Sequence, residues 1–207
     1  MKHIQKGILV VLSAVSGAGK TTVTNHLLKR DSNFVRSVSV TTRARHPGEK
    51  EGLDYFFVSK EEFDDMVRQG SFLEYQEVHS NYYGTPKKFV AEKMNEGKNV
   101  VLVIDTKGGL NVKKMFKDTV LIFLLPPSLK ELIKRLNIRG RESQEERLKR
   151  INNGKEELRD ALRYDYIVVN NRVEEAVEDI RAIVRSHFLK SDRNREKVMR
   201  IMKEYDI

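Results

Sequence analysis

The chain has 207 residues, which is enough for one compact core with small inserted lobes but too few for several independent domains. Apolar residues make up 39% of it and no run approaches a membrane span of roughly 20 residues, while the absence of cysteine excludes disulfide scaffolds and thiolate chemistry. The formal charge of +9 fits a nucleic-acid, anionic-lipid or polyanionic small-molecule partner, and equally an ordinary Lys- and Arg-rich surface.

The first predicted elements are a buried strand, a glycine-bearing turn and a helix near the N-terminus. The run GILVVL at 7–12 is typical of a fully buried parallel strand, and Val23, Leu27 and Leu28 have helical spacing. The turn between these elements reads SAVSGAGKTT at 13–22. A strand, a glycine-rich turn and a helix in this order form the context that a phosphate-binding loop requires.

The residue types of this turn suit the binding of a nucleoside triphosphate. Gly17 and Gly19 let the backbone wrap around an anion, and the helix adds its positive N-terminal end. Lys20 supplies charge for the β- and γ-phosphates, and the Thr21 hydroxyl is suited to ligate Mg²⁺. The strict pattern has glycine at position 14, so an ordinary small, basic turn stays as the alternative. The predicted triphosphate-binding residues are Ala14, Val15, Ser16, Gly17, Ala18, Gly19, Lys20, Thr21 and Thr22.

Beyond this turn, short aliphatic runs alternate with helix-like segments, which is the pattern of a parallel sheet. These runs lie at 8–12, 100–104, 120–125 and 166–169. The charged tail from 190 to 207 carries apolar residues at helical spacing and predicts a peripheral helix, to which we assign no function.

Several motifs occur in a fixed order and together closely resemble the guanylate kinase family. Residues 37–59 read SVSVTTRARHPGEKEGLDYFFVS, against the family pattern S-x-T-T-R-x-x-R-x-G-E-x-x-G-x-x-Y-x-F-V. Further matches are FLE at 72–74, NYYGT at 81–85, VVLVID at 100–105, LLPP at 124–127, RLNIRG at 135–140 and DYIVVN at 165–170. The resemblance extends over roughly residues 7–188, nearly the whole chain.

The resemblance implies an α/β fold: a phosphate-loop parallel sheet flanked by helices, with an inserted mixed-β lobe for the nucleoside monophosphate and a helical lid. We expect residues 1–207 to form a single domain of this kind. Its parts would be the core at 1–37, 90–127 and 164–190, the GMP-binding lobe at 38–89, the lid at 128–163 and the charged tail at 191–207.

The resemblance further implies that ATP is the phosphoryl donor and that Mg²⁺ accompanies it. Phosphoryl transfer depends on positioning and on charge neutralisation, and the acceptor phosphate is already anionic, so no strong general base is needed. Arg139 and Arg150 of the lid match residues that reach the transferring phosphates on closure, and with Lys20 they are the predicted catalytic residues. Asn170 matches a residue near the ATP adenine.

The acceptor phosphate, by the same resemblance, would be held by Arg43 and Tyr55 with help from Tyr83. Arginine suits this role because its planar fork pairs with two phosphate oxygens at once. Aromatic packing is the alternative role for both tyrosines.

The acceptor base would be recognised mainly by Glu74. A carboxylate can accept from both N1–H and the exocyclic amino group of guanine, whereas adenine offers no such donor pair on that edge. Ser39 and Thr85 match positions that hydrogen-bond the base, although each would also serve as an ordinary strand or turn hydroxyl. Asp105 matches an aspartate near the base and the metal's water shell, with a helix cap as the alternative.

The sequence departs from the family pattern at the acceptor and metal end. His46 stands where the family has arginine, with Arg45 one place early, and Val103 stands where it has aspartate. Residues 106–108 read TKG, where a hydrophobic residue and glutamine are usual. Either Arg45 reaches in from a shifted loop or the affinity for the acceptor is reduced, and neither change touches the ATP end of the site.

These observations predict an ATP-dependent kinase that converts GMP, and dGMP, to the diphosphate. A kinase of another small phosphate acceptor, such as a ribose bisphosphate, and a non-catalytic interaction module are the alternatives. A nucleic-acid binder lacks a supporting signature. We expect small-molecule partners (ATP and GMP), no nucleic-acid or membrane partner and a cytoplasmic location, and leave open whether the protein is a monomer or a homodimer.

Overall fold

The computed structural model describes residues 5–78, 80–138 and 154–206, and it confirms the predicted α/β class. Its larger sheet has five parallel strands in the order β2-β7-β1-β8-β9. The strands are β2 (Phe34–Arg36), β7 (Asn99–Val103), β1 (Leu9–Ala14), β8 (Val120–Leu125) and β9 (Tyr166–Val169). Four of these coincide with the predicted aliphatic runs to within two residues at either end. The short β2 carries only three residues and went unpredicted.

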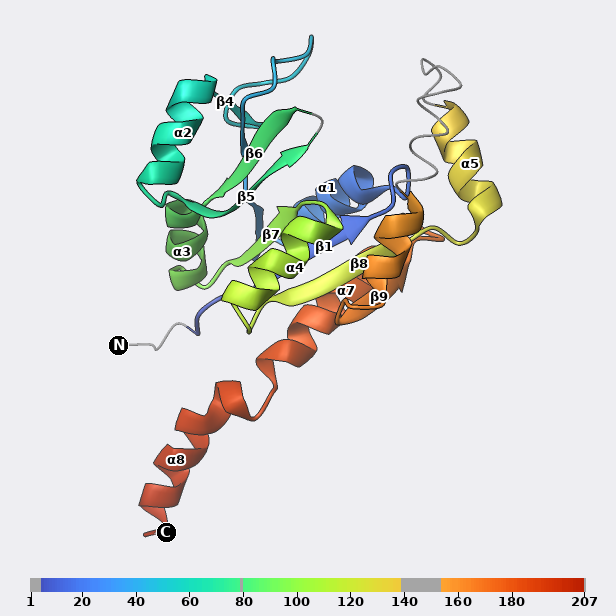
Figure 1. The fold of residues 1–207 in the computed structure, drawn as a ribbon. Helices are drawn as coiled ribbons and strands as arrows, with labels where there is room; N and C mark the ends of the chain where they lie inside the picture. Colours follow the sequence, from blue (N-terminus) through green and yellow to red (C-terminus); the bar gives the residue numbers. More distant parts are fainter. Residues whose placement is uncertain (1–4, 79, 139–153, 207) are drawn as a thin grey trace.

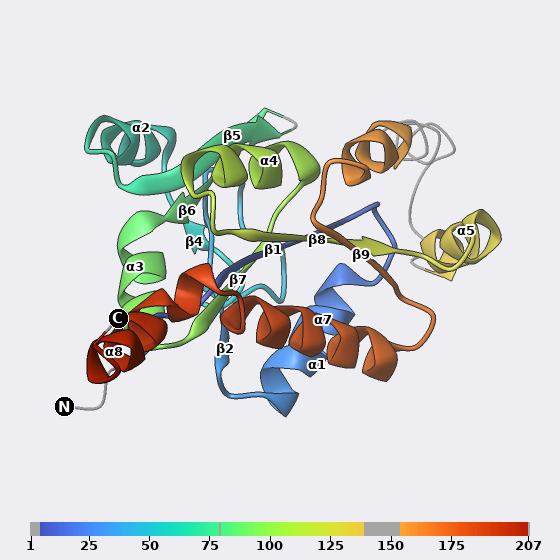
Figure 2. The same ribbon diagram turned by 90° about the horizontal axis from the view of Figure 1, so that it is seen from below.

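Helices cover both faces of this sheet because its central strands are apolar on both sides. Every residue of β1 is buried, and so are five of the six residues of β8. Figure 2 shows α4 (Thr106–Met115) on one face, and α1 (Lys20–Arg30) and α7 (Val173–Phe188) side by side on the other. This arrangement brings the carboxyl ends of the strands, and the turns that follow them, to one edge of the sheet.

A second sheet of four strands forms a separate lobe above that edge (Figure 1). Its strand order is β4-β3-β6-β5, and it is mixed because β3 pairs parallel with β4 but antiparallel with β6. The strands are β3 (Val40–Thr41), β4 (Phe56–Phe57), β5 (Phe72–Val78) and β6 (Asn81–Pro86). All of them fall within the 38–89 range expected for the inserted lobe.

Helix α2 (Lys60–Arg68) closes the lobe, and α3 (Lys87–Asn95) leads from it back to β7. A capping box starts α2, since the Ser59 hydroxyl accepts from the Glu62 N–H and the Glu62 carboxylate accepts from the Ser59 N–H. The lobe has a core of its own, in which the ring of Phe63 stacks on Phe72 at 4.6 Å between centroids.

The remaining helices extend from the body of the molecule. Helix α5 (Leu129–Ile138) follows β8 and begins the predicted lid, and residues 154–161 are helical before β9. The predicted tail helix is present as α8 (Arg195–Glu204), which follows the short η1 turn (Asp192–Asn194) and points away from both sheets (Figure 1). None of the helices in the described ranges has the length and apolar character to traverse a bilayer.

Phe63→Ala should destabilise the lobe, because Phe63 is fully buried and removal of its ring leaves a cavity beside Phe72. We expect a loss of about 3–5 kcal/mol in the free energy of unfolding, measured by urea denaturation. The matched control is Phe56→Ala in β4, where the ring is 41% exposed and the loss should be far smaller. Equal losses for the two variants would contradict a separate lobe core.

Candidate active site

The loop between β1 and α1 has the backbone conformation of an anion cradle. Gly17 and Gly19 have φ angles of 89° and 94°, in the left-handed region that glycine tolerates best. Gly19 caps α1 without any side-chain hydrogen bond, and no acidic residue lies in the first turn of the helix. The N–H groups at this helix end are therefore available to a phosphate.

The side chain of Asn170, directly after β9, supports this loop. Its Nδ2 donates to the Ala18 carbonyl at 2.7 Å, and its side chain is buried. A Cβ on Gly19 would lie 2.5 Å from the same Nδ2, so the loop and Asn170 fit only while position 19 has no side chain. The guanidinium of Arg135, on α5, donates to the Asn170 carbonyl at 3.3 Å and reaches the Ala18 carbonyl at 3.5 Å. The predicted adenine neighbour is thus a support for the phosphate loop in this structure.

Lys20 is the charged centre of the loop. Burial lowers the pKa of Lys20, and the carboxylates of Glu157 and Asp105 oppose that shift. The guanidinium of Arg36 acts in the same direction as burial, which places a second cation near the ammonium group. Cations concentrated in a partly desolvated site favour a polyanionic ligand.

Glu157, in the helical segment 154–161, was missed by the sequence reasoning. Burial raises the pKa of Glu157, while the Lys20 ammonium and the Ser16 N–H stabilise its charged form. This helical segment, which lies within the predicted lid range, therefore contacts the phosphate loop directly. The only sequence signal was an acidic residue downstream of the lid arginines, one among many.

Thr21 and Thr22 are exposed in the first turn of α1, where the Thr21 hydroxyl is free to ligate a metal. Within the described ranges, no group of three or more His, Cys, Asp or Glu side chains forms a metal site. This donor set fits Mg²⁺ that keeps most of its ligands from nucleotide phosphates and water.

A cavity of about 180 Å³ lies between the phosphate loop and the inserted lobe. The structure brings Lys20 to this cavity together with five of the seven predicted acceptor residues. These are Ser39, Tyr55, Glu74, Tyr83 and Asp105. The other two, Arg43 and Thr85, contact members of this group.

Glu74 is a buried carboxylate, 8% exposed, on strand β5. Thr85, across the strand pair, donates its hydroxyl to Glu74 Oε1 at 2.6 Å. Burial raises the pKa of Glu74 to about 7, and the nearby charge of Asp105 adds to the shift. A buried carboxylate whose ionised form is disfavoured is stabilised most by a ligand that brings two hydrogen-bond donors.

Arg43, Tyr55 and Tyr83 form one cluster beside the cavity. The Arg43 guanidinium lies 5.3 Å from the centre of the Tyr55 ring, and the rings of Tyr55 and Tyr83 are 5.9 Å apart. Glu49 pairs with Arg43 at 2.7 Å and raises its pKa. Glu49 holds the loop in shape, since its other oxygen accepts from the His46 N–H at 2.8 Å.

The residues that depart from the family pattern can be located in the structure. The side chains of Arg45 and His46 are exposed, and Val103 lines the cavity. Asp105 is the N-cap of α4, accepting from the Gly108 N–H at 2.8 Å, and at the same time it lines the cavity. Both roles weighed for Asp105 in the sequence are therefore compatible. Arg139 and Arg150, like Arg141 and Arg147, lie outside the described residues.

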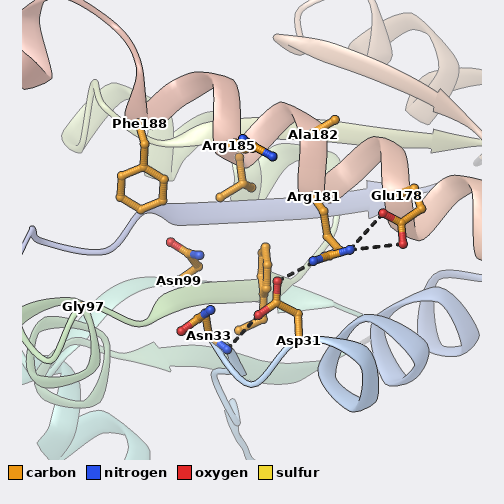
Figure 3. Close-up of a pocket in the computed structure, with 11 residues that line it drawn as sticks. Asp31, Asn33, Gly97, Asn99, Glu178, Arg181, Ala182, Arg185 and Phe188 are labelled. Carbon is orange, nitrogen blue, oxygen red and sulfur yellow. Dashed lines mark hydrogen bonds and ion pairs between the residues drawn. The ribbon is translucent and has the colours of Figure 1, made fainter.

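A larger cavity of about 420 Å³ lies at the opposite edge of the sheet, between α7 and the amino ends of β2 and β7 (Figure 3). It contains none of the predicted site residues. Arg181 crosses it and pairs with both Asp31, at 3.1 Å, and Glu178, at 2.9 Å (Figure 3). The pair with Asp31 ties α7 to the end of α1, while the pair with Glu178 lies within α7, and together they indicate a structural role for this region.

The fold and the site define a class before any comparison. A glycine-rich phosphate loop at the carboxyl edge of a parallel sheet, facing an inserted lobe with a buried acid, is the arrangement of a P-loop nucleotide-binding protein.

The comparisons specify the family within this class. A family model described as guanylate kinase matches residues 6–187. The guanylate kinase of Caldanaerobacter subterraneus subsp. tengcongensis is 44% identical over 200 residues, covering 97% of each chain, and that of Thermotoga maritima is 47% identical over 199 residues, covering 96% of each. The crystal structure of guanylate kinase from Anaplasma phagocytophilum matches with a TM-score of 0.76 at 37% identity, over 91% of this chain and 90% of that chain. The chain belongs to the guanylate kinase family.

Asn170→Ala should weaken nucleotide binding, because it removes the short hydrogen bond from Asn170 to the Ala18 carbonyl, leaves only the longer contact from Arg135, and loosens the loop. We expect the dissociation constant of a fluorescent ATP analogue to rise by about tenfold. Asn171→Ala, at the exposed neighbouring position, is the control and should bind as the wild type does. Unchanged affinity in a folded Asn170→Ala protein would exclude the bracing role.

Proposed function

We propose that this protein is a guanylate kinase, which transfers the γ-phosphoryl group of ATP to GMP, and to dGMP, yielding ADP and the nucleoside diphosphate. The observation that carries the proposal is that Lys20 of the phosphate loop and the buried Glu74 of the lobe line one cavity. A donor phosphate and an acceptor guanine nucleotide bound at these two residues would meet there. The alternatives, a ribose bisphosphate kinase and a non-catalytic interaction module, find no support in the comparisons.

At the donor end, the loop N–H groups and Lys20 hold the triphosphate. Mg²⁺ would be carried by the phosphates, water and the Thr21 hydroxyl, and it would neutralise charge on the β- and γ-phosphates. Lys20 remains close to the phosphates during transfer, and its low-dielectric surroundings strengthen its effect on developing charge. Asn170 keeps the loop rigid, so the donor is presented in one position.

At the acceptor end, Arg43 and Tyr55 would bind the phosphate of GMP, with the Tyr83 hydroxyl beside them. Arg43 is already oriented by Glu49 and by the Tyr55 ring, so little side-chain freedom is lost on binding. The exposed position of His46 leaves Arg43 as the arginine that faces the tyrosine cluster from this loop.

Glu74 would select guanine by accepting from N1–H and from the exocyclic amino group. Thr85 holds Glu74 Oε1, and Ser39 lines the same cavity. AMP would leave the buried carboxylate without a donor pair, and this is costly. Discrimination on the order of 10³ or more between GMP and AMP follows from such a mismatch.

The remaining parts of the proposal rest on the family relationship. Arg139 and Arg150 of the lid would join Lys20 around the transferring phosphoryl group and help to exclude water. The partners would be the small molecules ATP and GMP, without nucleic acid or membrane. The enzyme would act in purine nucleotide metabolism in the cytoplasm.

An assay of ADP release with GMP, dGMP, AMP, UMP and ribose bisphosphate tests this function directly. We expect turnover with GMP and dGMP and at least 10³-fold lower kcat/KM with AMP. Lys20→Ala, purified in the same way, should lose at least 10²-fold in kcat with its fold intact, which also rules out a contaminating kinase. Lys29→Ala, at the exposed end of α1, is the matched control. Equal use of AMP and GMP, or turnover of ribose bisphosphate alone, would refute the proposal.

GMP utilisation should fall at low pH, because protonated Glu74 cannot accept from guanine. With the pKa of Glu74 raised to about 7, its ionised fraction decreases as the pH drops through 7. We expect kcat/KM for GMP to fall about tenfold from pH 8 to pH 6. Glu74→Gln is the control, because it retains every titration other than that of Glu74, including that of the GMP phosphate. Identical pH profiles for the wild type and Glu74→Gln would show that Glu74 does not titrate in this range.

A further inference from the structure

Gln76 lies beside Glu74 in the acceptor cavity and has no role in the site as described so far. It follows Glu74 by two residues on β5, so the two side chains lie on the same face of the strand. Both line the cavity. A Cβ atom built on Gly108 would lie 3.3 Å from Gln76 Nε2 and 3.3 Å from Glu74 Oε2. The amide nitrogen of Gln76 and the Oε2 atom of Glu74 are therefore near neighbours.

The orientation of the Gln76 carboxamide follows from its contact with Asp105. Gln76 Nε2 donates to Asp105 Oδ2, and the Gly108 N–H donates to Asp105 Oδ1. A carboxylate can only accept, so the amide nitrogen must face Asp105 and the amide oxygen must face elsewhere. Among the described residues, no donor is paired with Gln76 Oε1. The amide oxygen is thus an acceptor without a donor among these residues, on a side chain that lines the same cavity as Glu74.

A guanine ring bound by Glu74 needs one more acceptor in this place. Guanine presents three protons on this edge, one on N1 and two on the exocyclic amino group. The Glu74 carboxylate can take the N1 proton and one amino proton, while its Oε1 already accepts from Thr85. The second amino proton needs a further acceptor, because a buried donor without a partner is costly. Asp105 lines the same cavity, but its Oδ1 already accepts from the Gly108 N–H and its Oδ2 from Gln76.

We propose that Gln76 is a second guanine-recognition residue, which accepts the remaining proton of the exocyclic amino group through Oε1 while its Nε2 holds Asp105. The acceptor class that this arrangement selects is a 2-aminopurine nucleoside monophosphate. IMP, which keeps N1–H but lacks the amino group, gains nothing from Gln76. This inference rests on the proposed kinase function of the same cavity.

Gln76→Leu tests the proposal by comparing GMP with IMP. It removes the amide at nearly constant volume, and kcat/KM for GMP should fall about tenfold, the effect of one buried hydrogen bond. The value for IMP should stay within about twofold, so the preference for GMP over IMP shrinks by about the same factor of ten. Gln69→Leu, the same substitution at the exposed end of α2, should leave both values unchanged.

The outcomes separate the inference from the proposed function. An equal loss with GMP and IMP, or no loss with GMP, would overturn the role of Gln76 while leaving guanylate kinase activity intact. A wild-type protein that phosphorylates neither nucleotide would overturn the proposed function and this inference together. If Gln76→Leu fails to fold, judged by its thermal melting curve, Gln76→Met serves the same comparison.

Discussion

The partial desolvation of the Lys20 ammonium at the carboxyl edge of the parallel sheet is the constraint on which the rest of the site depends. A cation removed from water needs anionic neighbours, and here they come from two separate segments, Asp105 after β7 and Glu157 in the helical segment before β9. The loop that carries Lys20 can approach these partners only because glycines at 17 and 19 adopt positive φ angles and Asn170 supports the loop from β9. The result is a rigid cradle with unused N–H donors, which is completed by phosphate.

The opposite problem arises at Glu74, where an acid is buried near another acid. Both burial and the charge of Asp105 disfavour the ionised carboxylate, so the empty pocket is electrostatically unfavourable. Thr85 and the Gln76–Asp105 contact relieve part of this cost, and a ligand with a pair of N–H donors can relieve more. The proposed selectivity for guanine would then follow from hydrogen-bond satisfaction and would not depend on the shape of the pocket alone. The two regions proposed to bind the nucleotides thus have opposite electrostatic character.

The elements that the sequence predicted well are those whose signals are local. Four aliphatic runs marked strands of the parallel sheet, of which β9 is partly exposed, and the spacing of Val23, Leu27 and Leu28 marked α1. A continuous apolar run or a helical spacing is a local signal, because it reflects the surroundings of each residue. The three residues of β2 were too few to show such a pattern. The candidate acceptor residues came from a family resemblance. In the structure five of the seven line one cavity, and the other two contact residues that line it. Gln76 and Glu157 belong to no motif, and nothing in the sequence separates them from the other polar residues of the chain.

The sequence by itself determined the phosphate loop, the α/β class and the family, because glycine conformation, hydrophobic periodicity and motif order are properties of contiguous residues. Only the tertiary structure decided that Asn170 supports the loop, that Asp105 both caps a helix and lines the pocket, and that Gln76 lines this pocket with Glu74 and donates to Asp105. Each of these depends on which atoms of distant segments meet within hydrogen-bonding distance. The packing of the two sheets decides which of these atoms meet. The burial that accompanies the packing then sets the strength of each polar contact, because a hydrogen bond is stronger in surroundings of low dielectric constant.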